Sequence, residues 1–261
     1  MKLIKYILLG LIQGFTEPLP ISSSGHVIIF SYFFNIDIGL DFLTFINLGS
    51  LFAIILYYRK SICSLMTGSF KYLYTKDKIF EEKFFYVLKI FIALIPVGVV
   101  GLFFKDYIDL YFSNIKTVTI CLLFTGIILL CVCFWKKGNE KISFFSSIFV
   151  GIGQIGGLLP GISRSGITTA CGVSSNVSLE DSLNFSFLLY IPLSLGAGLL
   201  SLNDVCFSVN GVFYFLSFIA SFGATYLSLL IFFRMVRKNN LIYFAIYCII
   251  LSVILFCIVW R

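Results

Sequence analysis

EPLPISSSGH, residues 17–26, interrupts a stretch of sequence that is otherwise apolar enough to lie in a membrane. MKLIKYILLGLIQGFT precedes it and VIIFSYFF follows it, whereas the decapeptide holds a carboxylate, two prolines, three serines and the only histidine of the chain. Prolines and clustered polar side chains end a helix. Residues 3–34 are therefore predicted to form a helix-loop-helix hairpin that enters the membrane and returns.

Composition places the whole chain in a membrane. Of its 261 residues, 59% are hydrophobic and 12% are charged, and the mean hydropathy is +1.04. Segments such as LFAIILYY are apolar on every side, which excludes the alternating pattern of a β-barrel. We expect an all-α polytopic membrane protein with residues 1–261 as a single membrane domain, and no cleavage of the N-terminal segment as a secretory signal.

The net charge of +7 does not indicate a nucleic-acid partner, because lysine and arginine flank apolar spans instead of gathering on one face. The eight cysteines form no C-x-x-C pair and are expected to act as small apolar side chains. Six segments are long enough to cross the membrane. They are residues 42–58, 84–104, 117–135, 183–201, 211–233 and 241–260.

A second broken segment, residues 143–178, resembles the first. Shifting the chain by 141 positions lays GLIQGFTEPLPISSSG (10–25) on GIGQIGGLLPGISRSG (151–166) without a gap. A hairpin and three spans follow one another in both halves, which indicates two repeats, about 1–135 and about 143–261. Because three crossings is an odd number, the repeats are predicted to have inverted topology.

The distribution of lysine and arginine predicts the orientation of the chain in the membrane. If residues 59–83 are cytoplasmic, that side collects most of the basic residues, and the N-terminus lies outside. The two hairpins then enter from opposite sides, and their breaks are expected to meet near the middle of the membrane. The cytoplasmic bases are Arg59, Lys60, Lys71, Lys76, Lys78, Lys83, Lys136, Lys137, Lys141, Arg234, Arg237 and Lys238, against Lys2, Lys5, Lys105, Lys116 and Arg261 outside.

Two charged residues, Glu17 and Arg164, lie in the breaks. Charge inside a membrane is costly unless it is paired or used, so these residues either form a structural ion pair or belong to a site. Serines precede the second helix of each hairpin, where free backbone N–H groups attract anions. Each serine could simply cap its helix, but two such helix starts beside Arg164 predict a phosphate pocket. The serines are Ser22, Ser24, Ser163 and Ser165.

Proton-transfer groups lie in the same break. His26 is expected to face the same gap as Ser23 and to exchange a proton with a nucleophile or a leaving group. Gln13 and Glu17, four residues apart, are expected to share one helical face. Gln154 repeats Gln13 in the second half and is a candidate for substrate binding, although bonding to backbone carbonyls of the hairpin is the role we favour.

The motifs Gln13-x-x-x-Glu17, PISSSGH (20–26) and PGISRSGIT (160–168) together resemble the undecaprenyl-diphosphatase family, also called bacitracin-resistance proteins. The likeness extends through residues 40–60 and 184–192. It implies a bacterial inner-membrane phosphatase that converts undecaprenyl diphosphate to undecaprenyl phosphate and recycles this carrier lipid for cell-wall synthesis. It further implies competition with bacitracin for the lipid, a site open to the periplasm and activation by Mg2+ or Ca2+; a homo-oligomer remains open.

The resemblance assigns roles by position. It implies that the catalytic residues are Glu17, Ser23, His26 and Arg164. It implies that the phosphate-binding residues are Ser22, Ser24, Ser163, Ser165 and Thr168. Gln13 departs from the acidic form of the motif, which leaves Glu17 as the one carboxylate for a cation; Pro18 and Asn47 are further departures.

Two mechanisms and two functions stay open at this stage. Ser23 could attack the terminal phosphorus, or water could attack with Glu17 as the base. Broken helices that meet within inverted repeats also build the sites of transporters, so a carrier or flippase for an anionic lipid is the alternative. The combination of Glu17, Ser23 and His26 favours an enzyme, since binding an anion requires none of them.

Overall fold

The computed structural model describes residues 2–36, 39–135, 138–201, 211–237 and 241–260, and within these ranges the chain is helical with no strand. The first half contains α1 (Lys2–Thr16), α2 (Ser23–Phe34), α3 (Leu40–Thr75), a short 3-10 turn (Lys78–Phe80), α4 (Glu81–Phe112) and α5 (Ile115–Phe134). The second half contains α6 (Phe144–Gly156), α7 (Arg164–Ser174), α8 (Leu179–Ser201), α9 (Gly211–Arg237) and α10 (Ile242–Val259).

Six of these helices are long and apolar enough to span a membrane: α3, α4, α5, α8, α9 and α10. They coincide with the six predicted spans, so a multi-pass membrane protein is confirmed. The two segments predicted as broken hairpins are the pairs α1–α2 and α6–α7, each with a short non-helical break before a serine-capped second helix.

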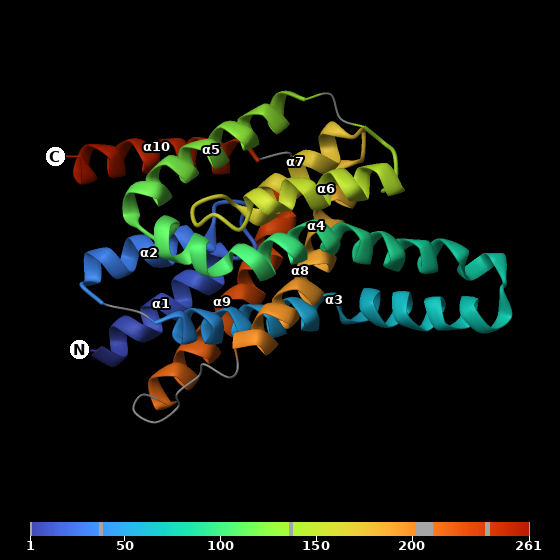
Figure 1. The fold of residues 1–261 in the computed structure, drawn as a ribbon, viewed down its shortest axis with the longest axis horizontal. Coiled ribbons are helices and arrows are strands. Elements are labelled where there is room, and N and C mark those ends of the chain that lie inside the picture. Colours follow the sequence, from blue (N-terminus) through green and yellow to red (C-terminus); the bar gives the residue numbers. More distant parts are fainter. Residues whose placement is uncertain (1, 37–38, 136–137, 202–210, 238–240, 261) are drawn as a thin grey trace.

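One predicted boundary is wrong. The span predicted to end at residue 58 continues as α3 to Thr75, so residues 59–83 are mostly helix instead of loop. In Figure 1, α3 and α4 form a helical pair that projects beyond the rest of the bundle. Lys83 holds the pair together, since its Nζ donates to Ser64 Oγ at 2.8 Å and its carbonyl accepts from Ser69. Arg59 and Lys60 therefore mark the point at which the sequence becomes polar, and the helix continues past them to Thr75.

The halves pack on each other in a reciprocal way. Helix α1 of the first half packs on α9 of the second, and α6 of the second packs on α4 of the first. Gly10 lies against the backbone of Ser217 in α9, and Gly151 lies against the backbone of Ala93 in α4. The 141-residue alignment pairs these two glycines, and at both places a side chain would collide with a carbonyl. Backbones that approach so closely are typical of helix packing in membranes.

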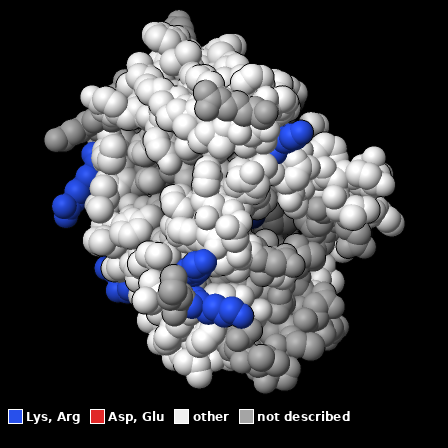
Figure 2. Space-filling model, turned by 90° about the vertical axis from the view of Figure 1, so that its left-hand side faces the viewer, with Lys and Arg blue, Asp and Glu red and all other residues white. Residues whose placement is uncertain are grey.

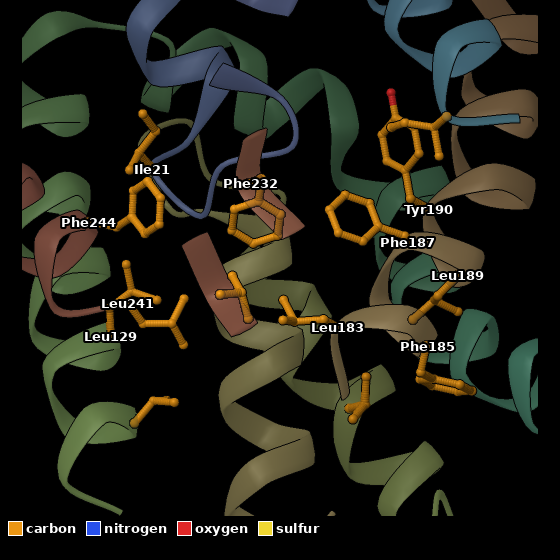
Figure 3. Close-up of a cluster of buried hydrophobic side chains, with 14 of the residues drawn as sticks. Ile21, Leu129, Leu183, Phe185, Phe187, Leu189, Tyr190, Phe232, Leu241 and Phe244 are labelled. Atoms are coloured by element: carbon orange, nitrogen blue, oxygen red, sulfur yellow. The ribbon is translucent and has the colours of Figure 1, made fainter. Parts of the chain in front are cut away.

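The core combines an apolar cluster with buried hydroxyls. In Figure 3, Ile21 of the first break points toward Phe244 of α10 within the main buried cluster. Between α3 and α9, Ser50 Oγ lies 2.9 Å from both Ser221 Oγ and Thr225 Oγ1. Figure 2 views the end of the bundle that lies to the left in Figure 1, and its basic side chains occupy separate places instead of one patch.

The glycine contacts make a prediction about stability. Gly10→Ala should lower the free energy of unfolding by about 1–3 kcal/mol, because its methyl group would overlap the Ser217 carbonyl. Gly223→Ala is the matched control in a spanning helix, since a Cβ there meets no atom within 4 Å. Thermal unfolding in detergent, followed by circular dichroism, measures both. Equal midpoints for the two variants would contradict the close packing of α1 on α9.

Candidate active site

The two hairpin breaks meet, as predicted from the sequence. The backbone N–H of Gly161 in the second break donates to Ser22 Oγ in the first at 3.1 Å. Thr125 of α5 secures the second break, since its Oγ1 donates to the Gly161 carbonyl at 2.8 Å and accepts from the N–H of Ser163 at 3.0 Å. Gly161 has φ of +99°, a left-handed conformation that favours glycine.

The starts of α2 and α7 share one capping arrangement. Ser22 Oγ accepts from the N–H of Gly25 at 3.3 Å, and Ser163 Oγ accepts from the N–H of Gly166 at 3.1 Å. A second serine follows each cap, with Ser22 and Ser24 hydroxyls 3.4 Å apart and the corresponding pair in α7 3.3 Å apart. The capping role considered for Ser22 and Ser163 is thus confirmed. The other N–H groups in the first turn of each helix have no partner within the helix and can bind an anion.

Glu17 lies at the centre of the site and has three partners. Its Oε1 lies 3.2 Å from Arg164 Nη2, and its Oε2 accepts from Gln13 Nε2 at 2.7 Å. The same Oε2 accepts a short hydrogen bond from the Ser23 hydroxyl. The Glu17 side chain is 8% exposed and that of Arg164 is 25% exposed. A carboxylate in contact with a serine hydroxyl has the geometry of a general base beside a nucleophile.

Sequence reasoning missed Tyr190. Its ring lies beneath the Arg164 guanidinium, with Cζ 4.3 Å from the ring centroid. Its hydroxyl donates to Asn47 Oδ1 at 2.7 Å, and Gln13 Nε2 approaches the same oxygen at 3.5 Å. In Figure 3 this hydroxyl points out of the apolar cluster. The available sequence signal was a tyrosine two residues before Pro192 in a spanning helix. Packing in the apolar core explained that tyrosine equally well.

A cavity of about 710 Å³ connects these residues to the end of the bundle. Its polar part is lined by Gln13, Glu17, Ser22, Ser23, Ser24, Asn47, Ser163, Arg164, Ser165 and Tyr190. Its apolar part includes Ile28, Ile36, Leu43 and Ile115, and it reaches the α4–α5 turn at Ser113 and Asn114. In Figure 1 this turn lies at the same end of the bundle as the start of α1. A cavity with one polar and one apolar part suits a phosphorylated lipid.

His26 is not oriented as predicted. It does not line the cavity, and its ring nitrogens lie 2.8 Å from the Ser22 carbonyl and 2.7 Å from the Tyr247 hydroxyl. The expectation that it faces the gap beside Ser23 is therefore wrong. At about 100° per residue, His26 is rotated about 60° from Ser23 around the helix axis, and this offset places its ring against Tyr247 of α10 instead of in the cavity.

Two other candidates also lie outside the cavity lining. Thr168 bonds the Arg164 carbonyl at 2.8 Å and Ser186 Oγ at 2.6 Å, so it supports the first turn of α7. Gln154 is 1% exposed, and its amide has no hydrogen-bond partner among the described residues. The favoured role of bonding hairpin carbonyls is wrong for this residue. When the chain is shifted by 141 positions, Glu17 and Asn47, the partners of Gln13, align with Leu158 and Leu188. Gln154 therefore has no equivalent polar partners in the second half.

The donor set does not suit a resident divalent cation. The described residues contain no group of three or more His, Cys, Asp or Glu side chains that could hold a metal. Glu17 is the one carboxylate among the described residues that line the cavity, and Arg164, Gln13 and Ser23 already contact its oxygens. Mg2+ and Ca2+ bind several oxygen ligands, of which carboxylates are the strongest.

Comparison with known protein sequences identifies the family of the chain. A family model described as bacitracin resistance protein BacA matches residues 6–254. The chain belongs to the BacA family. Undecaprenyl-diphosphatase 2 of Bacillus thuringiensis (strain Al Hakam) is 41% identical over 259 residues, which cover 97% of this chain and 96% of the relative.

Two further relatives carry the same name. Undecaprenyl-diphosphatase 1 of Bacillus licheniformis is 40% identical, covering 96% of both chains. Undecaprenyl-diphosphatase of Oceanobacillus iheyensis is 38% identical, covering 97% of this chain and 95% of the relative. The resemblance predicted from the three sequence motifs is thereby confirmed, and it extends over nearly the whole length of these BacA-family proteins.

Thr125 provides a test of how the breaks are held. Thr125→Val removes the hydroxyl that bonds Gly161 and Ser163, which leaves buried backbone groups without partners. The expected loss in the free energy of unfolding is about 1–3 kcal/mol. Thr125→Ser keeps the hydroxyl and should unfold within a few degrees of the wild type. A valine variant as stable as the serine variant would show that this hydroxyl does not hold the break.

Proposed function

We propose that this protein hydrolyses undecaprenyl diphosphate to undecaprenyl phosphate and inorganic phosphate in the bacterial inner membrane. The contact of Glu17 with the Ser23 hydroxyl beside Arg164, at the polar part of a cavity with an apolar outlet, carries this proposal. Membership of the BacA family and the shared name of the relatives support it. The reaction recycles the carrier lipid for cell-wall synthesis and confers bacitracin resistance, because bacitracin competes for the same diphosphate.

The site residues act in the following order. Glu17 Oε2 takes the proton of Ser23 as the hydroxyl oxygen forms a bond to the terminal phosphorus. The bond from phosphorus to the bridging oxygen breaks, and the electron pair leaves with undecaprenyl phosphate. Water then hydrolyses the phosphoserine, which releases phosphate and restores Ser23. Arg164 and the N–H groups at the starts of α2 and α7 hold the oxygens of the phosphoryl group.

This order replaces His26 by Glu17 as the proton acceptor, because the carboxylate contacts the hydroxyl directly. Ser24, Ser163 and Ser165 line the polar part of the cavity and bind phosphate oxygens together with Ser22. Gln13 orients Glu17 through its amide and lies within reach of the substrate. Thr168 acts from behind Arg164 and does not contact the substrate.

The test for the nucleophile is phosphate release from a C55 isoprenyl diphosphate by purified protein. Ser23→Ala should lose activity by about 10²-fold or more, and Glu17→Gln by about 10²-fold, since each removes one member of the pair. Rapid acid quenching of the wild type should trap a phosphoserine at residue 23, and Ser31→Ala, which removes a hydroxyl of the same helix that bonds the Val27 carbonyl, is the control that keeps it. Full turnover by Ser23→Ala would establish water as the nucleophile.

A divalent cation, Mg2+ or Ca2+, is proposed to reach the site with the diphosphate, since the protein residues alone do not form a resident site. When present it neutralises charge on the phosphate oxygens, and Glu17 is the carboxylate available beside it. Arg164 supplies the fixed positive charge of the site in either case.

Gln13→Glu tests the cation dependence. The substitution places a second carboxylate one helical turn from Glu17, so the Mg2+ concentration for half-maximal activity of chelator-treated protein should fall about tenfold. Gln13→Ala is the control, because it removes the amide without adding charge and should not lower that concentration. An unchanged Mg2+ dependence in Gln13→Glu would mean that no cation binds beside Glu17.

The topology is proposed to be an inverted repeat with the site open to the periplasm. The reciprocal packing of α1 on α9 and of α6 on α4, the paired glycines and the matched serine caps support two related halves. The excess of lysine and arginine in residues 59–83 supports a cytoplasmic position for the projecting end of α3 and α4. The cavity reaches the opposite end of the bundle, which is then periplasmic.

A lipid transporter is the rival function, because broken helices meeting between two repeats are also a transporter feature. The two functions predict different results in vesicles loaded with labelled C55 isoprenyl diphosphate. The enzyme releases phosphate, and Glu17→Ala and Arg164→Ala each abolish the release. Movement of intact lipid without phosphate release would establish the rival.

A further inference from the structure

Ser22 has a backbone conformation that a non-glycine residue rarely adopts. Its φ is +66° and its ψ is +93°, a conformation that disfavours any residue with a Cβ. Ser22 also precedes Ser23, so its conformation sets the direction from which the Ser23 hydroxyl enters the site. The surrounding structure must therefore hold this peptide in place.

The hydroxyl and the carbonyl of Ser22 are both held by hydrogen bonds. Its hydroxyl oxygen accepts from the N–H of Gly25 at 3.3 Å and of Gly161 at 3.1 Å. Its carbonyl accepts from the backbone N–H of His26 at 3.2 Å and lies 2.8 Å from the His26 ring Nδ1. The histidine side chain thus adds a bond to the carbonyl of a strained residue.

The tautomer of His26 follows from its partners. A carbonyl oxygen can only accept a hydrogen bond, so Nδ1 carries the proton that faces Ser22. Nε2 of the neutral ring then accepts from the Tyr247 hydroxyl, 2.7 Å away on α10. The two rings are stacked with centroids 5.6 Å apart and planes at 11°. With His26 only 2% exposed, both nitrogens are engaged inside the protein and neither faces the cavity.

We infer that Tyr247 is a positioning residue for the reaction. Its hydroxyl fixes the His26 ring, the ring fixes the Ser22 carbonyl, and Ser22 in turn fixes Ser23 against Glu17. Helix α10 is thereby coupled to the first hairpin across 221 residues of sequence. This inference rests on the proposed function, and it makes His26 a positioning residue as well instead of a proton carrier.

The first experiment separates orientation from substrate binding. Tyr247→Phe keeps the stacked ring but removes the hydroxyl, so kcat for release of phosphate from C55 isoprenyl diphosphate should fall about tenfold, while KM stays within about twofold. Tyr243→Phe is the matched control, one turn earlier on α10 and 59% exposed, and it should match the wild type. A Tyr247→Phe variant with wild-type kcat would overturn the inference.

The second experiment uses the fact that His26 is the only histidine of the chain. Selective 15N-histidine labelling then gives one ring to observe by NMR. The wild type should show a protonated Nδ1 and an unprotonated Nε2, and Tyr247→Phe should move the Nε2 resonance toward that of a free imidazole nitrogen. Tyr243→Phe should leave both resonances in place. A protonated Nε2 paired with an unprotonated Nδ1 would overturn the inference.

A third variant separates the two roles of His26. His26→Asn keeps a donor near the position of Nδ1 but cannot carry a proton, so it should retain more activity than His26→Ala if the side chain only positions Ser22. Equal and complete loss in both variants would overturn the positioning role. If the wild type released no phosphate, the proposed function would fail, and the NMR comparison would still decide whether Tyr247 holds His26.

Discussion

Backbone groups left unpaired where a helix breaks inside a membrane must find partners within the protein, and this constraint shapes the rest of the structure. The two breaks satisfy each other, because Ser22 Oγ accepts from Gly161 N–H while Thr125 bonds both Gly161 and Ser163. The first hairpin and α5 thus both supply partners for the backbone of the second break. The polar space between them is a consequence of that pairing, and the charged residues occupy it.

The two halves share their structural residues and differ in their chemical ones. The glycines that allow close packing and the serines that cap α2 and α7 occur at matching positions in both halves. Glu17 and Asn47, in contrast, stand opposite leucines, and Ser23 stands opposite Arg164. The proposed reaction therefore takes its base and its nucleophile from the first half and the guanidinium of Arg164 from the second. Gln154, which aligns with Gln13, is buried with no partner for its amide among the described residues.

Sequence patterns predicted what depends on composition and local order. Hydropathy located the spans, proline and serine located the breaks, and the cost of charge in a membrane pointed to Glu17 and Arg164. The length of α3 was not predictable in this way, because helix continues after the apolar stretch ends. Contacts such as Tyr190 with Asn47 and Tyr247 with His26 join residues 143 and 221 positions apart. Periodicity carries no information about such pairs, so the orientation of His26 was predicted wrongly.

The choice of arginine at position 164 follows from the geometry of the site. A guanidinium group is planar and presents several N–H groups, so it can bond Glu17 through Nη2 and lie over the Tyr190 ring at the same time. Its other N–H groups remain available for the oxygens of a phosphate. A lysine ammonium group is a single point of charge, so it could not contact Glu17, the Tyr190 ring and a phosphate at the same time. The pair of Glu17 and Arg164 is neutral overall, which lowers the cost of keeping both charges inside the membrane.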